Sequence, residues 1–361
     1  MVNSVLPSSL ISSSSVKELV INSTHNSTEA TSMPSVYVAR NPAMAAAEII
    51  SHEEIPTIDL SLLIRRSEKT SADERAKVIQ QIGEACEDWG CFMVVNHGVS
   101  EDLQRKMIEA YLDFFDMKEE EKQRYNSKSF IDSVVYNSSF DQTTNEVLYW
   151  RDTLRTTVHP TFNSPDLPQN FRLISEEFSR RTREIVKQLL IAICEGLGIE
   201  ENRTEECLGL ASCYQIISGN LYPPCPQPEL ALGLPPHSDA GLLNVLLQNN
   251  SFPGLQVMHN GNWVPVQLIP NSLFINVSDL LEIFSNGKYK SLLHRATVDK
   301  KMTRLSVATL IGSSWEGVVV APAAELVETE PAAFRGITYK DYIRHYQTGK
   351  LNKRPLAAMR L

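Results

Sequence analysis

The sequence predicts a mainly β fold with flanking helices, in which a sandwich or jelly-roll barrel follows a helical N-terminal region. In the first half, apolar residues recur every three or four positions over long stretches, a spacing typical of amphipathic helices. From about residue 213, short β-prone segments separated by Pro, Gly and Asn-Gly turns replace this pattern. Seven strands are expected there, near residues 213–222, 242–248, 255–259, 262–267, 272–278, 293–298 and 304–312.

The N-terminal half predicts strands that alternate with helices. IPTIDLSLL (55–63) is apolar and β-prone behind a proline, so we expect a short strand there, followed by a helix over 74–89. CFMVVNHGV (91–99) predicts a buried strand, and Ser100 is a suitable N-cap for the next helix. A long amphipathic helix is expected from about Phe171 to Leu197, where a glycine follows.

The C-terminal half contains one strong hairpin signal, because Asn260-Gly261 separates the β-prone segments LQVMH and NWVPV. No repeat of 20 to 50 residues is visible. The Ser/Thr-rich N-terminus predicts a flexible tail, with an organelle transit sequence as the alternative. Four parts are expected: the tail (1–40), an α/β region (41–205), the barrel core (206–325) and a C-terminal helix or lid (326–361).

The composition favours an ordinary globular protein that acts on a small molecule. Of the 361 residues, 42% are hydrophobic and 21% charged, and no apolar run reaches the roughly 20 residues that span a bilayer. The net charge of -9 disfavours nucleic acid as a partner. The six cysteines form no CxxC pair, so they are interpreted as buried thiols in a reducing compartment. We therefore expect a cytoplasmic monomer that binds neither membrane nor nucleic acid.

His237 and Asp239 stand at the start of the apolar strand segment of PPHSDAGLLNVLLQ. Side chains at i and i+2 of a strand face the same way, so both can point into one cavity. His294, in LLHRATV, lies on another expected strand of the same barrel. Two imidazoles and one carboxylate on one side of an ion leave the opposite positions open, as in non-haem Fe(II) oxygenases. Taken alone, H-x-D is common by chance and a strand histidine is more often a core residue.

Arg304 and Ser306 add a second element to this constellation. They follow His294 across the short polar turn DKKMT and again share one strand face. A guanidinium with a hydroxyl beside it binds a carboxylate through charge-assisted hydrogen bonds. The barrel is therefore expected to contain a metal and, further in, a site for an anion. An exposed strand arginine is the alternative for Arg304 by itself.

These residues lie within motifs that resemble the plant branch of the iron(II)/2-oxoglutarate-dependent dioxygenases, the group related to isopenicillin N synthase. The resemblance covers about residues 35–361 and includes NLYPPCPQPELALGLPPHSD, GLQVMHNGNWVPV, SNGKYKSLLHRA, RLSVATLIG, IPTIDLSLL and ACEDWGCFMVVNHGV. It implies a double-stranded β-helix barrel in which His237, Asp239 and His294 bind iron. It also implies the residues that bind 2-oxoglutarate: Arg304, Ser306 and Tyr222 at the distal carboxylate, and Asn220 near the other end.

The substrate cavity is predicted less sharply. By strand parity Ser218 and Leu310 face the same cavity as the cofactor residues. Aromatic side chains suit an apolar substrate, and packing alone is the alternative interpretation for each. Four aromatic residues are candidates for the pocket wall: Phe130, Tyr136, Phe140 and Trp150.

The resemblance implies oxidative decarboxylation of 2-oxoglutarate to succinate and CO2, coupled to oxidation of a second substrate by O2, with ascorbate as reductant. Hydroxylation is the first expectation, and demethylation, desaturation and ring closure are alternatives. LYWRDTL and TLIG resemble tropane-alkaloid hydroxylase, whereas YPPCPQPELALG resembles flavonoid oxidases. The alternative functions are an iron oxidase of the same fold without 2-oxoglutarate, a catalytically silent metabolite-binding barrel, and a hydrolytic zinc enzyme.

Three positions depart from the family pattern. Leu221 replaces a position that is commonly aromatic, Asn244 stands where threonine is usual, and Ser278 replaces the usual glycine. Glycine is usually retained where the backbone needs a positive φ, so Ser278 raises the question of the local turn. Asn244 is expected to alter the surroundings of the iron.

Overall fold

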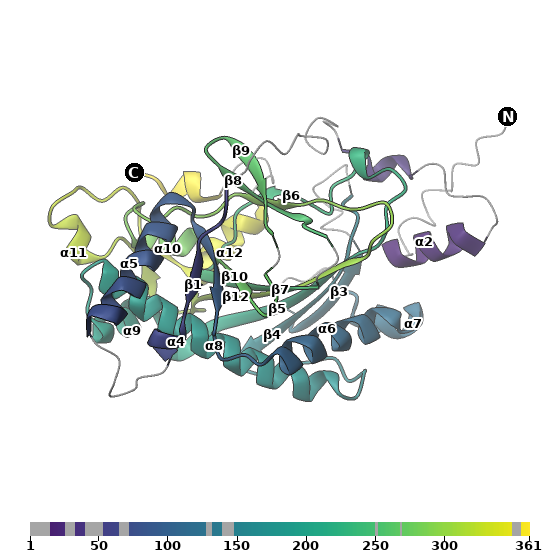
Figure 1. Cartoon of the computed structure of the whole chain (residues 1–361), viewed down its shortest axis with the longest axis horizontal. Helices are drawn as coiled ribbons and strands as arrows, with labels where there is room; N and C mark the ends of the chain where they lie inside the picture. The colour runs from purple at the N-terminus through teal and green to yellow at the C-terminus, as the bar shows by residue number, and fades with distance from the viewer. Residues whose placement is uncertain are drawn as a thin grey trace.

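An eight-stranded sheet lies at the centre of the structure, a computed structural model of the chain (Figure 1). Its neighbouring strands pair antiparallel except for β1 and β2. The strand order is β1 (Thr57–Asp59), β2 (Cys91–Val95), β10 (Leu273–Val277), β7 (Leu243–Gln248), β12 (Arg304–Ser314), β5 (Cys213–Tyr222), β4 (Asp152–His159) and β3 (Val134–Ser138). The structure describes residues 15–25, 33–39, 53–64, 72–127, 132–138, 148–249, 252–267, 269–348 and 355–361.

A second, four-stranded sheet lies on the other side of the barrel, above the large sheet in Figure 1. Its order is β6 (Leu234–His237), β11 (His294–Ala296), β8 (Leu255–His259) and β9 (Asn262–Pro265). A short third sheet pairs β13 (Val319–Val320) with β14 (Ile337–Thr338). The two larger sheets form the jelly-roll barrel that the sequence predicts.

Helices cover the outer face of the large sheet. The core contains apolar residues of α5 (Ala72–Asp88), α6 (Glu101–Asp116) and α8 (Phe171–Gly196), which pack against strands of the sheet. The short or peripheral helices are α2 (Val16–His25), α4 (Ser61–Ile64), α7 (Glu119–Lys122), α9 (Glu201–Leu208), α10 (Asp279–Phe284), α11 (Ala324–Val327) and α12 (Tyr339–Thr348). In the described part of the chain, no helix has the length and apolar character that a membrane span requires.

The sequence located the strands of the barrel to within about two residues. β5 and β8 begin and end where expected, and Ser100 accepts a hydrogen bond from Leu103 N as the N-cap of α6. The strand expected over 55–63 is shorter, because Asp59 accepts the Ser61 N–H and the chain turns into α4. β6 was not predicted, since it contains two prolines; it is an edge strand, where proline is tolerated.

The segment expected to be a flexible tail contains α2, which lies against the barrel. The first turn of α2 meets a buried carboxylate: Val16 N and Lys17 N donate to the two oxygens of Asp152 at 2.9 and 3.0 Å. Acceptors at a helix N-terminus satisfy donors that lack a partner inside the helix. Val16 also packs in a cluster with Tyr37 and Tyr222, so α2 lies near the expected 2-oxoglutarate residues.

Successive side chains of β5 point alternately toward the helix-covered core and into the barrel. Ile217 and Leu221 point toward the helices and are buried in the core, whereas Ser218 and Asn220 point into the barrel. Gly219 lies between them on the helix side. A Cβ at this position would be 2.1 Å from the ring of Tyr111, so glycine allows α6 to pack directly on the strand that carries the cofactor residues.

Replacing Gly219 by alanine is expected to destabilise the protein, because the added methyl overlaps the buried Tyr111 ring. Overpacking of this kind costs about 1 to 3 kcal/mol. Urea denaturation of Gly219→Ala, Tyr111→Leu and the double variant measures it. The double variant should lose less stability than the sum of the two single variants, since leucine leaves space for the methyl. Additive losses would contradict direct packing of the ring on this strand.

Candidate metal and cosubstrate site

The two histidines predicted as ligands form a cross-strand pair. Backbone register places His237, the last residue of β6, opposite His294, the first residue of β11. Their ring centroids are 4.1 Å apart. Asp239 follows two residues after His237, and the ligand atoms of all three side chains lie within 4.8 Å of one another. The structure thus brings together all three predicted ligands.

Backbone carbonyls orient both imidazoles. Nδ1 of His237 lies 2.8 Å from Pro235 O, and Nδ1 of His294 lies 3.2 Å from Leu292 O. A carbonyl only accepts, so Nδ1 carries the proton in each ring and the Nε2 lone pair remains for a metal. Burial, helped by His294, lowers the pKa of His237 and keeps it in the neutral form that binds metals.

The carboxylate of Asp239 faces both Nε2 atoms. Its oxygens lie 3.7 Å from His237 Nε2 and 3.8 Å from His294 Nε2. On the opposite side, Asn244 Nδ2 and Asn276 Nδ2 donate to Oδ2 at 2.8 and 2.9 Å. Burial alone would raise the pKa of Asp239, but the two histidines and the two amides outweigh it and lower the pKa, so the ligand is ionised.

This donor set fits a divalent iron ion. Two neutral imidazoles and one carboxylate supply three ligands from one side, and the interior of the barrel lies on the other side. No other group of three or more His, Cys, Asp or Glu residues suited to a metal occurs in the described part of the chain. The six cysteines are free thiols and none belongs to the ligand cluster; five are buried as the sequence predicts, whereas Cys207 is partly exposed.

The predicted anion site lies on the same inner face. Arg304 is opposite Tyr222 and Ser306 is opposite Asn220 in the β12–β5 ladder. Arg304 is 1% exposed and donates from Nη2 to Gln248 Oε1 at 2.8 Å. Its Nε and Nη1 have no hydrogen-bond partner among the described residues, and its guanidinium lies 5.0 Å from the centroid of the Tyr222 ring.

Two unpaired donors on a buried guanidinium fit a carboxylate, because a buried polar group without a partner is unfavourable. Burial lowers the pKa of Arg304, and Tyr222 opposes that effect. An anion with two oxygens would satisfy both N–H groups and neutralise the charge. The residues present therefore fit the distal carboxylate of 2-oxoglutarate.

Two functional neighbours escaped the sequence analysis. Gln248 positions Arg304, and Arg151 Nη1 donates to Asn220 Oδ1 at 2.8 Å. Gln248 could have been found, because it is four residues after Asn244 and shares its strand face. Arg151 precedes β4 and offers no such signal.

The candidates for the substrate cavity divide into several groups. Ser218 and Leu310 lie on the inner face, in cross-strand register with Ala308 and Asn244 respectively. Tyr136 lies on the opposite face, in the core against Phe114. Trp150 donates to Pro223 O and packs edge-on against Tyr37. Phe130 and Phe140 lie outside the described residues.

The three departures from the family pattern have different consequences. Ser278 has φ -112° and ψ 172°, an extended conformation open to any residue, so no positive φ is needed there. Leu221 is a core residue behind the cofactor face. Asn244 contacts the metal site directly, because its amide donates to Asp239, and its buried Oδ1 has no hydrogen-bond partner within the described chain.

The fold and the site together define a mononuclear non-haem iron oxygenase. Residues 206–313 match the 2OG-Fe(II) oxygenase superfamily, and residues 55–176 match a family described as non-haem dioxygenase in morphine synthesis N-terminal. The chain is 40% identical over 314 residues to 2-oxoglutarate-dependent dioxygenase 19 of Oryza sativa subsp. japonica, covering 86% of this chain and 91% of that protein.

Two further comparisons agree. The chain is 36% identical over 300 residues to leucoanthocyanidin dioxygenase of Malus domestica, covering 81% of this chain and 83% of that protein. The crystal structure of JOX2 in complex with 2OG, Fe and JA is similar with a TM-score of 0.83 and 27% identity, covering 96% of this chain and 98% of that one. This protein belongs to the 2OG-Fe(II) oxygenase superfamily and is a dioxygenase that uses Fe(II), 2-oxoglutarate and O2, with ascorbate as the typical reductant.

Asn244→Ala is expected to weaken Fe(II) binding about 10-fold, because one of the two donors that orient Asp239 is lost. Loss of a hydrogen bond to a metal ligand typically costs about 10- to 100-fold in affinity. Anaerobic Fe(II) titration in the presence of 2-oxoglutarate measures the change. Asn244→Thr, with a shorter donor, serves as the matched control. Its Fe(II) affinity should lie between those of the wild type and Asn244→Ala. Unchanged affinity in the alanine variant would show that Asn276 alone positions the carboxylate.

Proposed function

We propose that this dioxygenase hydroxylates, or otherwise oxidises, a small plant specialised metabolite such as an alkaloid or a flavonoid. In this proposal His237, Asp239 and His294 hold the iron, and Arg304, Ser306 and Tyr222 hold the distal carboxylate of 2-oxoglutarate. Asn220 lies near the other end of the cosubstrate. The observation that carries these roles is the pair of donors on buried Arg304 that have no partner among the described residues, on the face that also carries the Asp239 contacts.

The chain itself fixes the orientation of the cosubstrate. Arg304 is fixed before the cosubstrate arrives, since Gln248 holds one of its nitrogens and Tyr222 lies beside the guanidinium. A preoriented anion site fixes which end of the keto diacid reaches the iron ligands. Iron held by His237, Asp239 and His294 would supply the oxidative chemistry, in which O2 converts 2-oxoglutarate to succinate and CO2 and provides one oxygen atom for the second substrate.

The three alternative functions make less use of these residues. An iron oxidase that needs no 2-oxoglutarate would leave the buried Arg304 donors without an anion. A silent binding barrel would have no use for three metal ligands, two of which are imidazoles held in the metal-binding tautomer. A hydrolytic zinc enzyme would likewise have no evident use for the anion site formed by Arg304 and Ser306.

The substrate class rests on weaker support. A flavonoid substrate is supported by the 36% identity to leucoanthocyanidin dioxygenase. An alkaloid substrate is supported by the motifs LYWRDTL and TLIG. We also infer that the enzyme acts as a cytoplasmic monomer, because free thiols suit a reducing compartment. Size-exclusion chromatography with light scattering tests the monomer, and a C-terminal fluorescent fusion tests the location.

His237→Ala is expected to abolish the iron-dependent reaction, because the ion loses one of three protein ligands. The purified enzyme is incubated with Fe(II), 2-oxoglutarate, O2, ascorbate and a plant metabolite extract. Wild type should yield a product heavier by one oxygen atom, together with CO2 from C1 of labelled 2-oxoglutarate, and the variant should yield neither. Products without labelled CO2 would instead support the oxidase that needs no 2-oxoglutarate.

Arg304→Leu is expected to weaken 2-oxoglutarate binding at least 100-fold, since a hydrogen-bonded charge pair in a buried site is lost. The absorption band formed when 2-oxoglutarate chelates Fe(II) under anaerobic conditions reports this affinity directly. Arg304→Lys, which keeps the charge but cannot bind bidentately, should show an intermediate loss. Equal affinity in the leucine variant would remove Arg304 from the cosubstrate site.

A further inference from the structure

The turn that joins the ligands His237 and Asp239 is held at three points by residues that are not ligands. Ser238 Oγ donates to Asp279 Oδ2 at 3.2 Å, and both residues are buried. The hydroxyl of Tyr346 donates to Ser238 O at 3.1 Å. The backbone N–H of Asp279 donates to Asp239 O at 2.8 Å. The side chain and the backbone of this turn are therefore both fixed from outside the metal site.

Asp279 also reaches the segment that precedes the third ligand. Its Oδ1 accepts a hydrogen bond from the hydroxyl of Ser291 at 2.6 Å, and Ser291 is buried as well. The next residue is Leu292, whose carbonyl lies 3.2 Å from Nδ1 of His294. One buried carboxylate thus connects the two chain segments that carry the three ligands.

The C-terminal helix α12 completes this network. The hydroxyl of Tyr342 donates to Asp279 Oδ2 at 2.6 Å, and Tyr346 lies about one turn further along the helix. A carboxylate accepts hydrogen bonds, so each of the three hydroxyls around Asp279 is turned toward it. Burial, helped by Asp239 and Asp279, raises the pKa of Tyr346, so its hydroxyl keeps the proton that it donates to Ser238 O.

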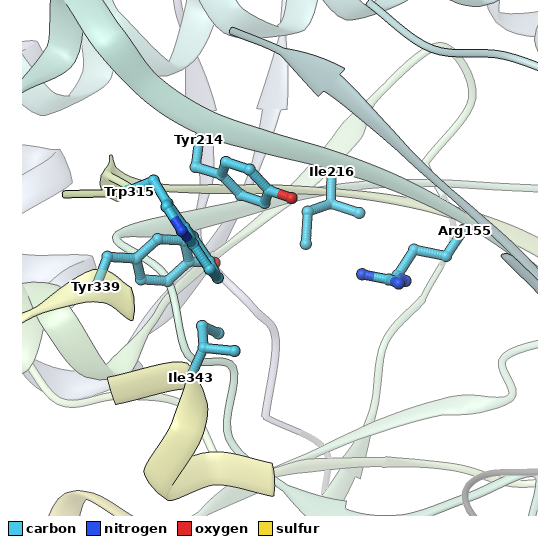
Figure 2. Close-up of a pocket in the computed structure, with 6 residues that line it drawn as sticks. All are labelled: Arg155, Tyr214, Ile216, Trp315, Tyr339 and Ile343. Atoms are coloured by element: carbon cyan, nitrogen blue, oxygen red, sulfur yellow. The ribbon is translucent and has the colours of Figure 1, made fainter. Parts of the chain in front are cut away.

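Aromatic packing holds α12 against the end of β12. Figure 2 shows Tyr339 and Ile343 of this helix beside Trp315 and Tyr214. The Tyr339 ring meets Trp315 at 90° with centroids 5.8 Å apart. The hydroxyl of Tyr339 has no hydrogen-bond partner among the described residues. The helix therefore carries two tyrosines that reach the ligand segments and one whose hydroxyl does not.

We propose that Asp279 is a positioning residue for the iron site, and that Tyr342 and Tyr346 extend this role to helix α12. The inference rests on the proposed function, because it assigns the iron to the three predicted ligands. A buried network whose members are hydrogen-bonded to one another holds its groups in one arrangement. The C-terminal helix thereby helps to set how tightly Fe(II) is bound and in which geometry.

Removing single hydroxyls from α12 tests the role of the helix. Anaerobic Fe(II) titration with 2-oxoglutarate present is run on the full chain. Tyr342→Phe and Tyr346→Phe should each weaken Fe(II) binding about 3-fold, because one hydrogen bond to the network is lost. Tyr339→Phe, on the same helix, is the matched control and should bind Fe(II) like wild type. Asp279→Asn should weaken binding about 10-fold, within the range for residues that position metal ligands.

A spectroscopic signature separates positioning from simple stabilisation. The nitric oxide complex of Fe(II) gives an EPR signal that reports the geometry of the ligands. Asp279→Asn should broaden or shift this signal, because the turn that carries His237 and Asp239 takes more than one arrangement. Tyr339→Phe should give the wild-type signal. Urea denaturation measures the stability of each variant separately.

Unchanged Fe(II) affinity and an unchanged EPR signal in folded Asp279→Asn would overturn the inference, even if its urea midpoint falls. Where Asp279→Asn does not fold, the tyrosine variants decide. Wild-type affinity in both Tyr342→Phe and Tyr346→Phe, or an equal loss in Tyr339→Phe, overturns it as well. A wild type that forms no Fe(II)–2-oxoglutarate absorption band would instead overturn the proposed function, so the two failures are distinguishable.

Discussion

The pairing of β6 with β11 is the constraint on which the metal site depends. It places His237 directly opposite His294, and a shift of one residue would turn one imidazole to the other face of the small sheet. The register alone would not suffice, because a histidine ring can bind through either nitrogen. The carbonyls of Pro235 and Leu292 resolve this by accepting hydrogen bonds from the two Nδ1–H groups, which leaves Nε2 of each ring for the metal. Backbone geometry thus specifies both the position and the tautomer of the ligands.

The polar groups of the barrel interior are held in place by neighbouring side chains, in positions suited to a metal ion and an anion. Asp239 receives two amide hydrogen bonds and faces two neutral imidazoles, which keep it ionised in a buried place. Arg304 is held on one nitrogen by Gln248, and its Nε and Nη1 have no acceptor in the part of the chain that the structure describes. Buried charges and donors without full partners lower stability. Their presence here is understandable if the cosubstrate supplies the missing acceptor.

The sequence predicted what depends on local pattern, and it failed where tertiary packing decides. The spacing H-x-D, H and R-x-S identified the residues that the structure brings together, since period two fixes the face of each strand. The same parity failed to exclude Tyr136, because nothing local shows that β3 turns this ring toward α6. For a similar reason, no local pattern shows that Trp315, Tyr339 and Arg155 line one pocket. They come from three elements far apart in sequence, and only the packing of α12 over β12 brings them together.

The inner face of the large sheet carries the residues discussed above at alternate positions along its strands. Along β12, Arg304 and Ser306 lie at the anion end, Ala308 follows, and Leu310 is level with Asn244 beside the iron ligands. Ile216 pairs with Leu310 and lines a small pocket together with Tyr214, Trp315 and Tyr339. The two sheets therefore divide the task of positioning the ligands, because His237 and His294 lie on the small sheet whereas Asp239 is held by Asn244 and Asn276 of the large sheet.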